Sequence, residues 1–247
     1  MKTILLFVFL RVRSLLFRIG IYVDRLSPSN CLDFQVSKGL SEYEIDFVID
    51  VGANKGQYAT ALRQFGYQGK IISIEPLSDA HQKLVRHARN DPKWQVAPRC
   101  AAGASNGNSE IFISGNSVSS SILQMAARHI KAAKKSAPIG SEEIAITRLD
   151  DLLLDFLEGD ERVFLKIDTQ GFEWSVLDGA PELLENVIGI QIEASIVELY
   201  SGQHLFDEIY ERLSQLGFSL WGIQNGFTDK VSGETLQFDM IMFKGPH

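Results

Sequence analysis

The sequence predicts an α/β fold that is built around a mostly parallel sheet. Residues 47–57 contain an apolar run, a glycine turn and the start of a helix. The same order recurs in residues 163–173, after which helical spacing continues to Gly179. Near the C-terminus, residues 218–223 and 238–243 are two apolar segments on either side of a glycine-rich stretch. Strands that alternate with helices are typical of a parallel sheet, and the last two segments are typical of an antiparallel hairpin.

The composition limits the class of protein. The chain has 247 residues, of which 45% are hydrophobic and 22% charged, as expected for one globular domain with a sizeable core. A formal net charge of −7 argues against binding to nucleic acid, because such proteins usually carry an excess of basic residues. Cys31 and Cys100 are too few for a disulfide framework, and no spacing typical of a metal cluster is present. We therefore predict a cytoplasmic protein in a reducing environment, without a nucleic-acid partner.

Residues 1–40 differ from residues 41–247, which we expect to form the domain. The apolar run at residues 4–10 is too short to cross a membrane, because a spanning helix needs about 20 apolar residues. Apolar residues fall on one helical stripe that excludes the arginines: Leu5, Phe9, Val12, Leu16 and Ile19. This pattern predicts a basic amphipathic helix, followed by a lead-in to the domain. Two interpretations of residues 1–24 remain open: peripheral contact with the inner membrane surface, or packing on the domain or on a second subunit of a homodimer.

The first glycine turn has a pattern that distinguishes between cofactors. Asp50, Gly52 and Gly56 form D-x-G-x-x-x-G, whereas dinucleotide sites use G-x-G-x-x-G. An acid just before the turn disfavours a phosphate and suits a cationic ligand. The next predicted strand ends at Glu75, whose carboxylate can accept two hydrogen bonds from the vicinal hydroxyls of a ribose. An adenosyl cofactor with a sulfonium and an amino-acid tail fits, with the ribose on Glu75 and the tail near Asp50 and Gly52. The alternative is a strand, turn and helix without a ligand.

At these residues the sequence resembles the FkbM type of S-adenosylmethionine-dependent methyltransferase. The resemblance runs from about residue 47 to the C-terminus, and its most specific part is LKIDTQGFEWSVLDGA at residues 165–180. It implies a Rossmann-like class I methyltransferase fold, with a seven-stranded, mostly parallel sheet and a C-terminal antiparallel hairpin. It also implies S-adenosyl-L-methionine as cofactor and O-methylation, often of a sugar hydroxyl in a glycolipid, polysaccharide or natural product.

Three other functions are alternatives to O-methylation. The first is a module that binds S-adenosylmethionine without turnover, and the intact glycine turn and Glu75 argue against it. The second is an N-methyltransferase; one that acts on nucleic acid would need an aromatic stacking residue after the fourth strand, where this chain has Asp168-Thr169-Gln170-Gly171. The third is an NAD-linked dehydrogenase, which the absent G-x-G-x-x-G disfavours.

We assign the expected cofactor site from the glycine turn, from Glu75 and from the family resemblance. In methyltransferases the adenine ring rests after the third strand, here residues 94–97, and small residues such as Ala101 would leave room for it. The expected cofactor-binding residues are Asp50, Gly52, Ala53, Asn54, Gly56, Gln57, Glu75, Pro76, Ala101 and Asp168.

Four acids fall at the carboxyl ends of predicted strands: Asp50, Glu75, Asp168 and Glu193. In an open α/β sheet that edge is where ligands bind, so we assign two acids to the cofactor and two to the substrate. Lys166 lies inside a predicted buried strand, where an unpaired charge is costly. We therefore expect it to pair with Asp168 or Glu193.

Methyl transfer to a hydroxyl needs an aligned donor and acceptor and a group that takes the hydroxyl proton. Asp168 is the first candidate for this base or for an orienting group, Glu193 is the second and His204 the third. A pair of carboxylates could also hold a divalent cation. No residues have a definite ligand spacing, so a metal ion is not expected and the metal site stays unassigned.

Residues 115–141 form a long polar segment, and we expect it to be a wall or lid over the substrate. Asn116 and its neighbouring serines could bind sugar hydroxyls, and Lys131, Lys134 and Lys135 could meet phosphates of a carrier lipid or nucleotide. The alternative is a solvated loop with a basic helix.

Overall fold

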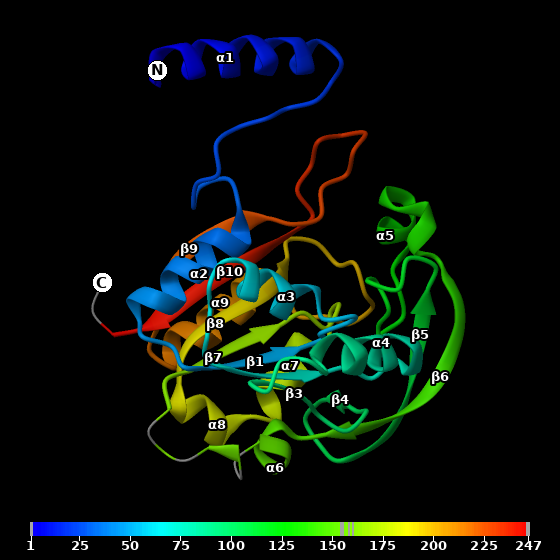
Figure 1. Ribbon diagram of the computed structural model, residues 1–247. Coiled ribbons are helices and arrows are strands. Elements are labelled where there is room, and N and C mark those ends of the chain that lie inside the picture. Colours follow the sequence, from blue (N-terminus) through cyan, green and yellow to red (C-terminus); the bar gives the residue numbers. More distant parts are fainter. Residues whose placement is uncertain (1, 154–155, 158, 160, 246–247) are drawn as a thin grey trace.

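The structure is a computed structural model that describes residues 2–153, 156–157, 159 and 161–245, with side chains from residue 9 onward (Figure 1). Its centre is a seven-stranded sheet. The strand order is β3 (Trp94–Val96), β2 (Lys70–Ile74), β1 (Phe47–Val51), β7 (Val163–Ile167), β8 (Val187–Ser195), β10 (Gln237–Lys244) and β9 (Phe218–Asn225). The first five strands are parallel, and β10 is antiparallel to both of its neighbours. The predicted fold class is therefore confirmed, including the C-terminal hairpin.

The strand register brings the ends of β2, β1 and β7 to one level, which β8 reaches at Ile192. Val51 pairs with both Ile74 and Ile167, and Ile167 pairs with Ile192. The chain order reverses between β1 and β7, because β2 and β3 lie on one side of β1 and the later strands on the other. Ligands of open α/β sheets bind at such a reversal, outside the carboxyl ends of the strands. The residues that follow these four strands are the ones to inspect for a site.

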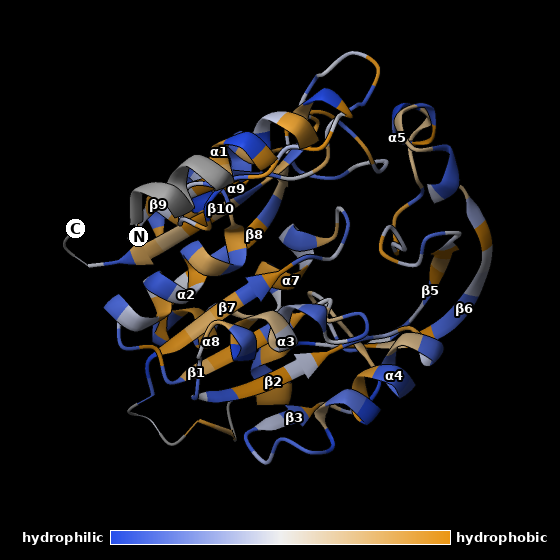
Figure 2. Ribbon diagram, turned by 45° about the horizontal axis from the view of Figure 1, so that its top comes forward, coloured by the Kyte–Doolittle hydropathy of each residue, from blue (hydrophilic) through white to orange (hydrophobic). Residues whose placement is uncertain are grey.

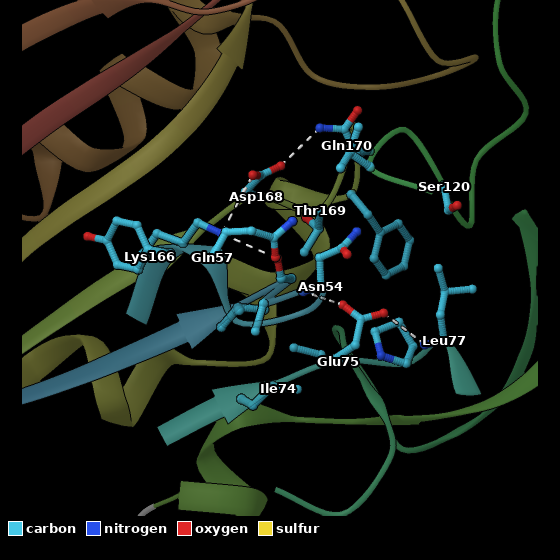
Figure 3. A pocket seen from close by; sticks show the side chains of 18 of the residues that line it. Asn54, Gln57, Ile74, Glu75, Leu77, Ser120, Lys166, Asp168, Thr169 and Gln170 are labelled. Atoms are coloured by element: carbon cyan, nitrogen blue, oxygen red, sulfur yellow. Dashed lines mark hydrogen bonds and ion pairs between the residues drawn. The ribbon is translucent and has the colours of Figure 1, made fainter. Parts of the chain in front are cut away.

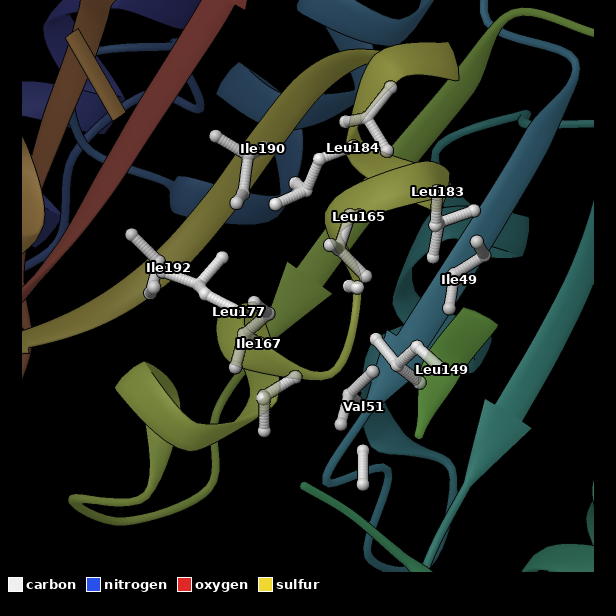
Figure 4. Close-up of a cluster of buried hydrophobic side chains, with 14 of the residues drawn as sticks. Ile49, Val51, Leu149, Leu165, Ile167, Leu177, Leu183, Leu184, Ile190 and Ile192 are labelled. Carbon is white, nitrogen blue, oxygen red and sulfur yellow. The ribbon is translucent and has the colours of Figure 1, made fainter. Parts of the chain in front are cut away.

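Helices cover both faces of the sheet. One face packs against α2 (Leu32–Glu42), α3 (Gln57–Gln64) and α4 (Ser78–Ala88). The other packs against α6 (Leu149–Leu153), α7 (Glu173–Asp178), α8 (Pro181–Asn186) and α9 (Phe206–Gln215). Figure 4 shows Ile49, Leu165 and Ile190 of neighbouring strands meeting leucines of α7 and α8. Burial on both faces explains why these strands are continuous apolar runs rather than alternating ones.

Helix α2 belongs to the domain core, although the sequence placed most of it in the lead-in. Its Val36 and Leu40 are buried in one cluster with Phe243 of β10. Tyr43, directly after the helix, stacks on the same Phe243 ring with centroids 3.9 Å apart. The packed part of the chain thus begins near Leu32.

A second, smaller sheet lies at one side of the main sheet (Figure 2). It consists of β4 (Ala101–Ala102), β6 (Pro138–Thr147) and β5 (Gly107–Ser114), with β5 and β6 antiparallel. The connection from β5 to β6 contains α5 (Ala127–Ala132) and the short 3₁₀ helix η1 (Lys134–Ser136). Ser121, His129 and Ser136 of this connection are buried. Residues 115–141 are therefore a packed segment whose lysines point to solvent, rather than a solvated loop throughout.

Helix α1 (Lys2–Arg18) stands away from the body of the molecule in Figure 1. The apolar side chains of Leu15, Phe17 and Ile19 are more than 60% exposed. Arg13 and Arg25 contact Tyr22 and Phe9, so the helix packs only lightly on the segment that follows it. In the structure, α1 therefore does not pack on its own domain, which was one part of the second interpretation. Leu5 of the predicted stripe lies outside the residues whose side chains are described. No helix within the described ranges is long and apolar enough to span a bilayer.

We predict that Leu165→Ala lowers the free energy of unfolding by about 2–5 kcal/mol, because Leu165 is fully buried in the cluster of Figure 4 and truncation leaves a cavity. Chemical denaturation at neutral pH measures this change. The control is Val231→Ala in the exposed β9–β10 loop, which should cost less than about 0.5 kcal/mol. Equal effects of the two variants would contradict the assignment of the core.

Candidate active site

The turn after β1 depends on two glycines for different reasons. Gly52 has a φ of +78°, and a Cβ there would overlap the carbonyl oxygen of Asp168 in the turn after β7. Gly56 has a φ of +88°, and its Cβ would meet the ring of Trp94 at 2.7 Å. The amides of Gly52 and Ala53 both donate to the carbonyl oxygen of Ile74. Gly52 thus lets the turns after β1 and β7 approach each other closely, and Gly56 leaves room for the Trp94 ring.

Glu75, the residue after β2, is held by backbone amides. Its Oε2 accepts a hydrogen bond from the Asn54 amide at 2.7 Å and its Oε1 accepts one from the Leu77 amide at 2.9 Å (Figure 3). Burial of this carboxyl raises its pKa to about 7, although the two amide hydrogen bonds act in the opposite direction. Glu75 is therefore fixed in position at the cavity wall, with further lone pairs available to a ligand.

A cavity of about 310 Å³ opens at these strand ends (Figure 3). One part of its wall is apolar and is formed by Ile74, Leu77, Ala101, Ala102, Ile111, Ile122 and Phe172. The other part carries the polar side chains of Asn54, Gln57, Glu75, Lys166, Asp168 and Asp239. Of the residues expected to bind the cofactor, Gly52, Ala53, Asn54, Gln57, Glu75, Pro76, Ala101 and Asp168 line this cavity. Gly56 does not line it, and neither does Asp50.

Asp50 lies below the cavity floor, where it pairs with Lys166. The Lys166 ammonium is 3.1 Å from Asp50 Oδ1 and 3.5 Å from Asp168 Oδ2, and it also donates to the Gly52 carbonyl oxygen at 3.3 Å. The expected pairing with Asp168 is confirmed, but the other partner is Asp50 and not Glu193. Burial raises the pKa of Asp50, and the Lys166 charge counteracts this. The strand alternation turns Asp50 toward Lys166 of the neighbouring strand, with which it is in register.

Gln170 connects the acid after β7 with the acid of β8. Its side-chain Nε2 donates to Asp168 Oδ1 at 2.9 Å and to Glu193 Oε2 at 2.5 Å, and its Oε1 accepts from the Tyr200 hydroxyl at 2.7 Å. Gln237 donates a second hydrogen bond to Glu193 Oε2 at 2.8 Å. Burial raises the pKa of Glu193 well above its usual range, and the nearby carboxylates of Asp168 and Asp239 add to this shift.

Behind Gln170 lies a second cavity of about 290 Å³. It shares Val118, Asp168 and Gln170 with the first cavity, so the two cavities meet at the end of β7. Its remaining wall is formed by Asn116, Ser119, His129, Ala133, Ser136, Glu193, Phe227 and Gln237. The sequence analysis had placed Asn116, Ser119, Asp168 and Glu193 near a substrate, but it had missed His129, Gln170 and Gln237. Among these, His129 could have been noted as the one histidine of residues 115–141, a segment otherwise rich in lysine.

His204 is not brought to either cavity. Its ring stacks on Trp174 with centroids 4.0 Å apart, and its Nδ1 lies 3.1 Å from Glu208 Oε1. Because Trp174 belongs to α7, which covers the sheet face, this stacking holds His204 on the outside of the helix layer. Within the part of the chain that the structure describes, no group of three or more His, Cys, Asp or Glu residues is arranged to hold a metal ion.

The fold and the cavity define an S-adenosylmethionine-dependent methyltransferase. More particularly, the chain belongs to the family of the methyltransferase FkbM domain, whose family model matches residues 50–220. A curated relative is methyltransferase sdnD of Sordaria araneosa, which is 26% identical over 220 residues, 79% of this chain and 80% of that protein.

The chain is also similar to solved structures of other proteins. One is an rRNA methylase from Streptococcus thermophilus, with a TM-score of 0.45, 11% identity, and coverage of 86% of this chain and 95% of that one. Another is the precorrin-6y C5,15-methyltransferase of Geobacter metallireducens, with a TM-score of 0.44, 13% identity, and coverage of 85% and 87%.

We predict that Lys166→Met lowers the free energy of unfolding by about 3–5 kcal/mol, because it leaves Asp50 buried without its cation. Urea denaturation at neutral pH measures the loss. The double variant Asp50→Asn/Lys166→Met should recover part of it, since the uncompensated charge is then removed.

The matched control is Lys83→Met, which removes an exposed ion pair with Asp79 and should cost less than about 0.5 kcal/mol. A Lys166→Met variant as stable as this control would contradict the buried pairing.

Proposed function

We propose that this methyltransferase transfers its methyl group to a hydroxyl of a sugar, in a glycolipid, polysaccharide or natural product. The observation that carries the proposal is the meeting of two cavities at Asp168. The first suits the cofactor, and the second is lined by neutral hydrogen-bonding side chains such as Asn116, Ser119 and Ser136. Neutral hydroxyl and amide groups match the alternating donors and acceptors of a polyol.

The residues of the first cavity fit the parts of S-adenosylmethionine. Glu75 would accept hydrogen bonds from the ribose hydroxyls, and the small residues Ala101 and Ala102 would leave room for the adenine ring. Lys166 would meet the carboxylate of the amino-acid tail, and Asp168 or Asp239 its ammonium group. When bound, the cofactor supplies an electrophilic methyl carbon next to a sulfonium.

Asp168 would orient the acceptor hydroxyl, because its side chain lines both cavities and is about one-third exposed. Its Oδ2 pairs with Lys166, and its hydrogen bond from Gln170 fixes Oδ1. The second oxygen could then accept a hydrogen bond from the acceptor. Alignment of this kind is a large part of what an enzyme contributes to a displacement reaction.

We predict that Glu75→Gln weakens binding of S-adenosylhomocysteine by about 2 kcal/mol, or about thirtyfold, since an amide cannot accept from both backbone amides and both ribose hydroxyls. Calorimetric titration measures the affinity, and NAD serves as a ligand that should not bind. Glu182→Gln on the exposed side of α8 is the control and should leave the affinity unchanged.

The same titration should depend on pH in a defined direction. The ionised carboxylate of Glu75 accepts more hydrogen bonds than the protonated one, and its pKa is about 7. The wild-type affinity should therefore rise between pH of about 6 and about 8, and the Glu75→Gln variant should lose this rise. Equal affinities of the two proteins across this range would remove Glu75 from the cofactor site.

We predict that Asp168→Asn lowers kcat about 100-fold or more and weakens S-adenosylhomocysteine binding less than tenfold, because Lys166 and Asp239 would still hold the cofactor tail. The assay follows S-adenosylhomocysteine formation with a panel of methyl glycosides of hexoses and deoxyhexoses, and mass spectrometry identifies the O-methylated product. If the variant turns over like wild type, Asp168 does not act on the acceptor.

Peripheral membrane contact through residues 1–24 is a further part of the proposal. Helix α1 contains one lysine and three arginines and no acid, whereas the whole chain has a net charge of −7. Its exposed apolar side chains, among them Val12, Leu15 and Phe17, suit the boundary between headgroups and acyl chains. A basic helix of this kind is attracted by anionic lipids, and a lipid-linked sugar would lie at the same surface.

We predict that the full chain sediments with vesicles containing anionic phospholipid, and that deletion of residues 1–27 abolishes this. The reason is that the deletion removes both the exposed apolar residues and the basic residues of α1. Uncharged vesicles are the control and should retain much less protein. Equal sedimentation of the truncated chain would place the membrane contact elsewhere, and a change from dimer to monomer on size exclusion would instead favour a second subunit.

A further inference from the structure

His129 occupies a distinctive position in the second cavity. It lies in α5, within the segment between β5 and β6, and it is only 2% exposed. The Tyr200 ring meets it edge-on with centroids 5.2 Å apart, and the Phe227 ring lies 5.1 Å away. A hydrogen bond from the Ser121 hydroxyl to the Gln170 carbonyl oxygen, 2.7 Å long, ties the same segment to the turn after β7. His129 is thereby held in the wall that it shares with Asp168.

The His129 side chain makes no hydrogen bond to any described residue, and its Nδ1 is buried without a partner. A buried polar group without a partner is destabilising, and proteins rarely retain one unless a ligand supplies the missing contact. Burial also lowers the pKa of this imidazole, which favours its neutral form. A neutral imidazole has a lone pair on one ring nitrogen, which can accept the hydrogen of a hydroxyl group.

The two carboxyl groups in the same cavity are less suited to take a proton. Both oxygens of Asp168 already have a partner, Lys166 at 3.5 Å from Oδ2 and Gln170 at 2.9 Å from Oδ1. Glu193 accepts from Gln170 and Gln237, and its raised pKa favours the protonated form. Tyr200, the remaining titratable group against the histidine, has a raised pKa and is a hydrogen-bond donor here.

The hydroxyl groups of the cavity are already ordered. Asn116 Nδ2 donates to Ser119 Oγ and Ser136 Oγ, each at 3.0 Å, and Asn116 Oδ1 accepts from Ser114 Oγ at 2.6 Å. The Ser119 hydroxyl donates to Ser136 Oγ at 3.4 Å, which leaves the hydrogen of the Ser136 hydroxyl for a ligand. These fixed neutral groups form a preorganised surface for a ligand with several hydroxyls.

We propose that the second cavity binds the acceptor as a polyhydroxyl compound and that the His129 imidazole takes the proton of the hydroxyl that is methylated. This inference rests on the proposed function. The acceptor oxygen forms a bond to the methyl carbon as the carbon–sulfur bond breaks, and the sulfonium becomes the neutral thioether of S-adenosylhomocysteine. The hydroxyl proton moves to the imidazole, which later releases it to solvent. Asp168 in this scheme orients the hydroxyl, and Asn116, Ser119 and Ser136 hold the rest of the acceptor.

The test compares His129→Gln with His87→Gln, a control at an exposed histidine of α4 that lies outside both cavities. Glutamine preserves a hydrogen-bonding group but not a base, so His129→Gln should lower kcat by about 10²–10⁴-fold. The KM for the methyl glycoside should change less than about tenfold, and the affinity for S-adenosylhomocysteine should match wild type. His87→Gln should behave as wild type in every measurement.

Three results would overturn the inference or part of it. If wild type methylates a glycoside and His129→Gln retains more than about one-tenth of its kcat, His129 is not the base while the proposed function stands. If wild type binds S-adenosylhomocysteine but methylates no glycoside in the panel, both the sugar acceptor and this inference fail. If the variant has lost S-adenosylhomocysteine affinity together with turnover, the loss is structural and a catalytic role is refuted.

A second variant tests the cavity without touching the histidine. Ala133 lines the second cavity and not the first, so Ala133→Leu fills space that the acceptor would occupy. It should raise the KM for the glycoside at least about tenfold and leave S-adenosylhomocysteine binding unchanged. An unchanged KM would show that the acceptor binds elsewhere.

Discussion

The buried charge cluster of Asp50, Lys166 and Asp168 is the constraint on which the rest of the site depends. Lys166 and Asp50 are opposite each other in neighbouring parallel strands, and both are almost fully buried. The same ammonium group holds Asp168 and the carbonyl oxygen of Gly52, one in each of the two turns. Buried pairs of this kind contribute little net stability, but removing one partner is costly. Their main effect here is to fix the two turns relative to each other at the point where the strand order reverses.

This cluster relates two sequence motifs that look independent. Asp50 and Gly52 belong to the first turn, and Lys166 and Asp168 to the second. A side chain at position 52 would overlap the backbone of Asp168, which the pairing of β1 with β7 places there. Lys166 also joins the two segments through its contact with the Gly52 carbonyl oxygen. The cluster also leaves Asp168 as its exposed end, where the carboxylate faces two cavities at once.

The sequence predicts the structural features that depend on local, repeating patterns of residues. The buried strands were recognisable because both of their faces are apolar, and Glu75 and Asp168 were recognisable because each follows such a strand. The whole length of β6 was not predictable, because most of its residues are exposed and carry no apolar period. The partner of Lys166 was predicted only in part, since periodicity does not reveal which of two acids lies in register on the next strand.

The histidines show most clearly where sequence reasoning ends. His204 is close in sequence to strand β8, so its proximity to the edge was a sensible hypothesis, yet its stacking on Trp174 keeps it from the cavities. His129 is far in sequence from any strand end of the main sheet, and only the folding of residues 115–141 against Gln170 and Tyr200 brings it there. Contacts between distant segments decide both outcomes, and no local pattern encodes them.

The carboxyl groups around the cavities share a further property, which follows from their burial. Desolvation raises the pKa of Glu75 and Glu173 to about 7 and that of Asp239 to about 6. Burial favours the neutral forms of these carboxyl groups in the folded chain. The stability that they contribute is therefore fully present below their ordinary pKa values near 4. It is lost as the pH rises through about 6–7. A cationic ligand offsets the resulting repulsion, because it favours the ionised forms. The site is therefore arranged so that a positively charged cofactor and the ionisation of these acids stabilise each other, which a neutral or anionic nucleotide would not do.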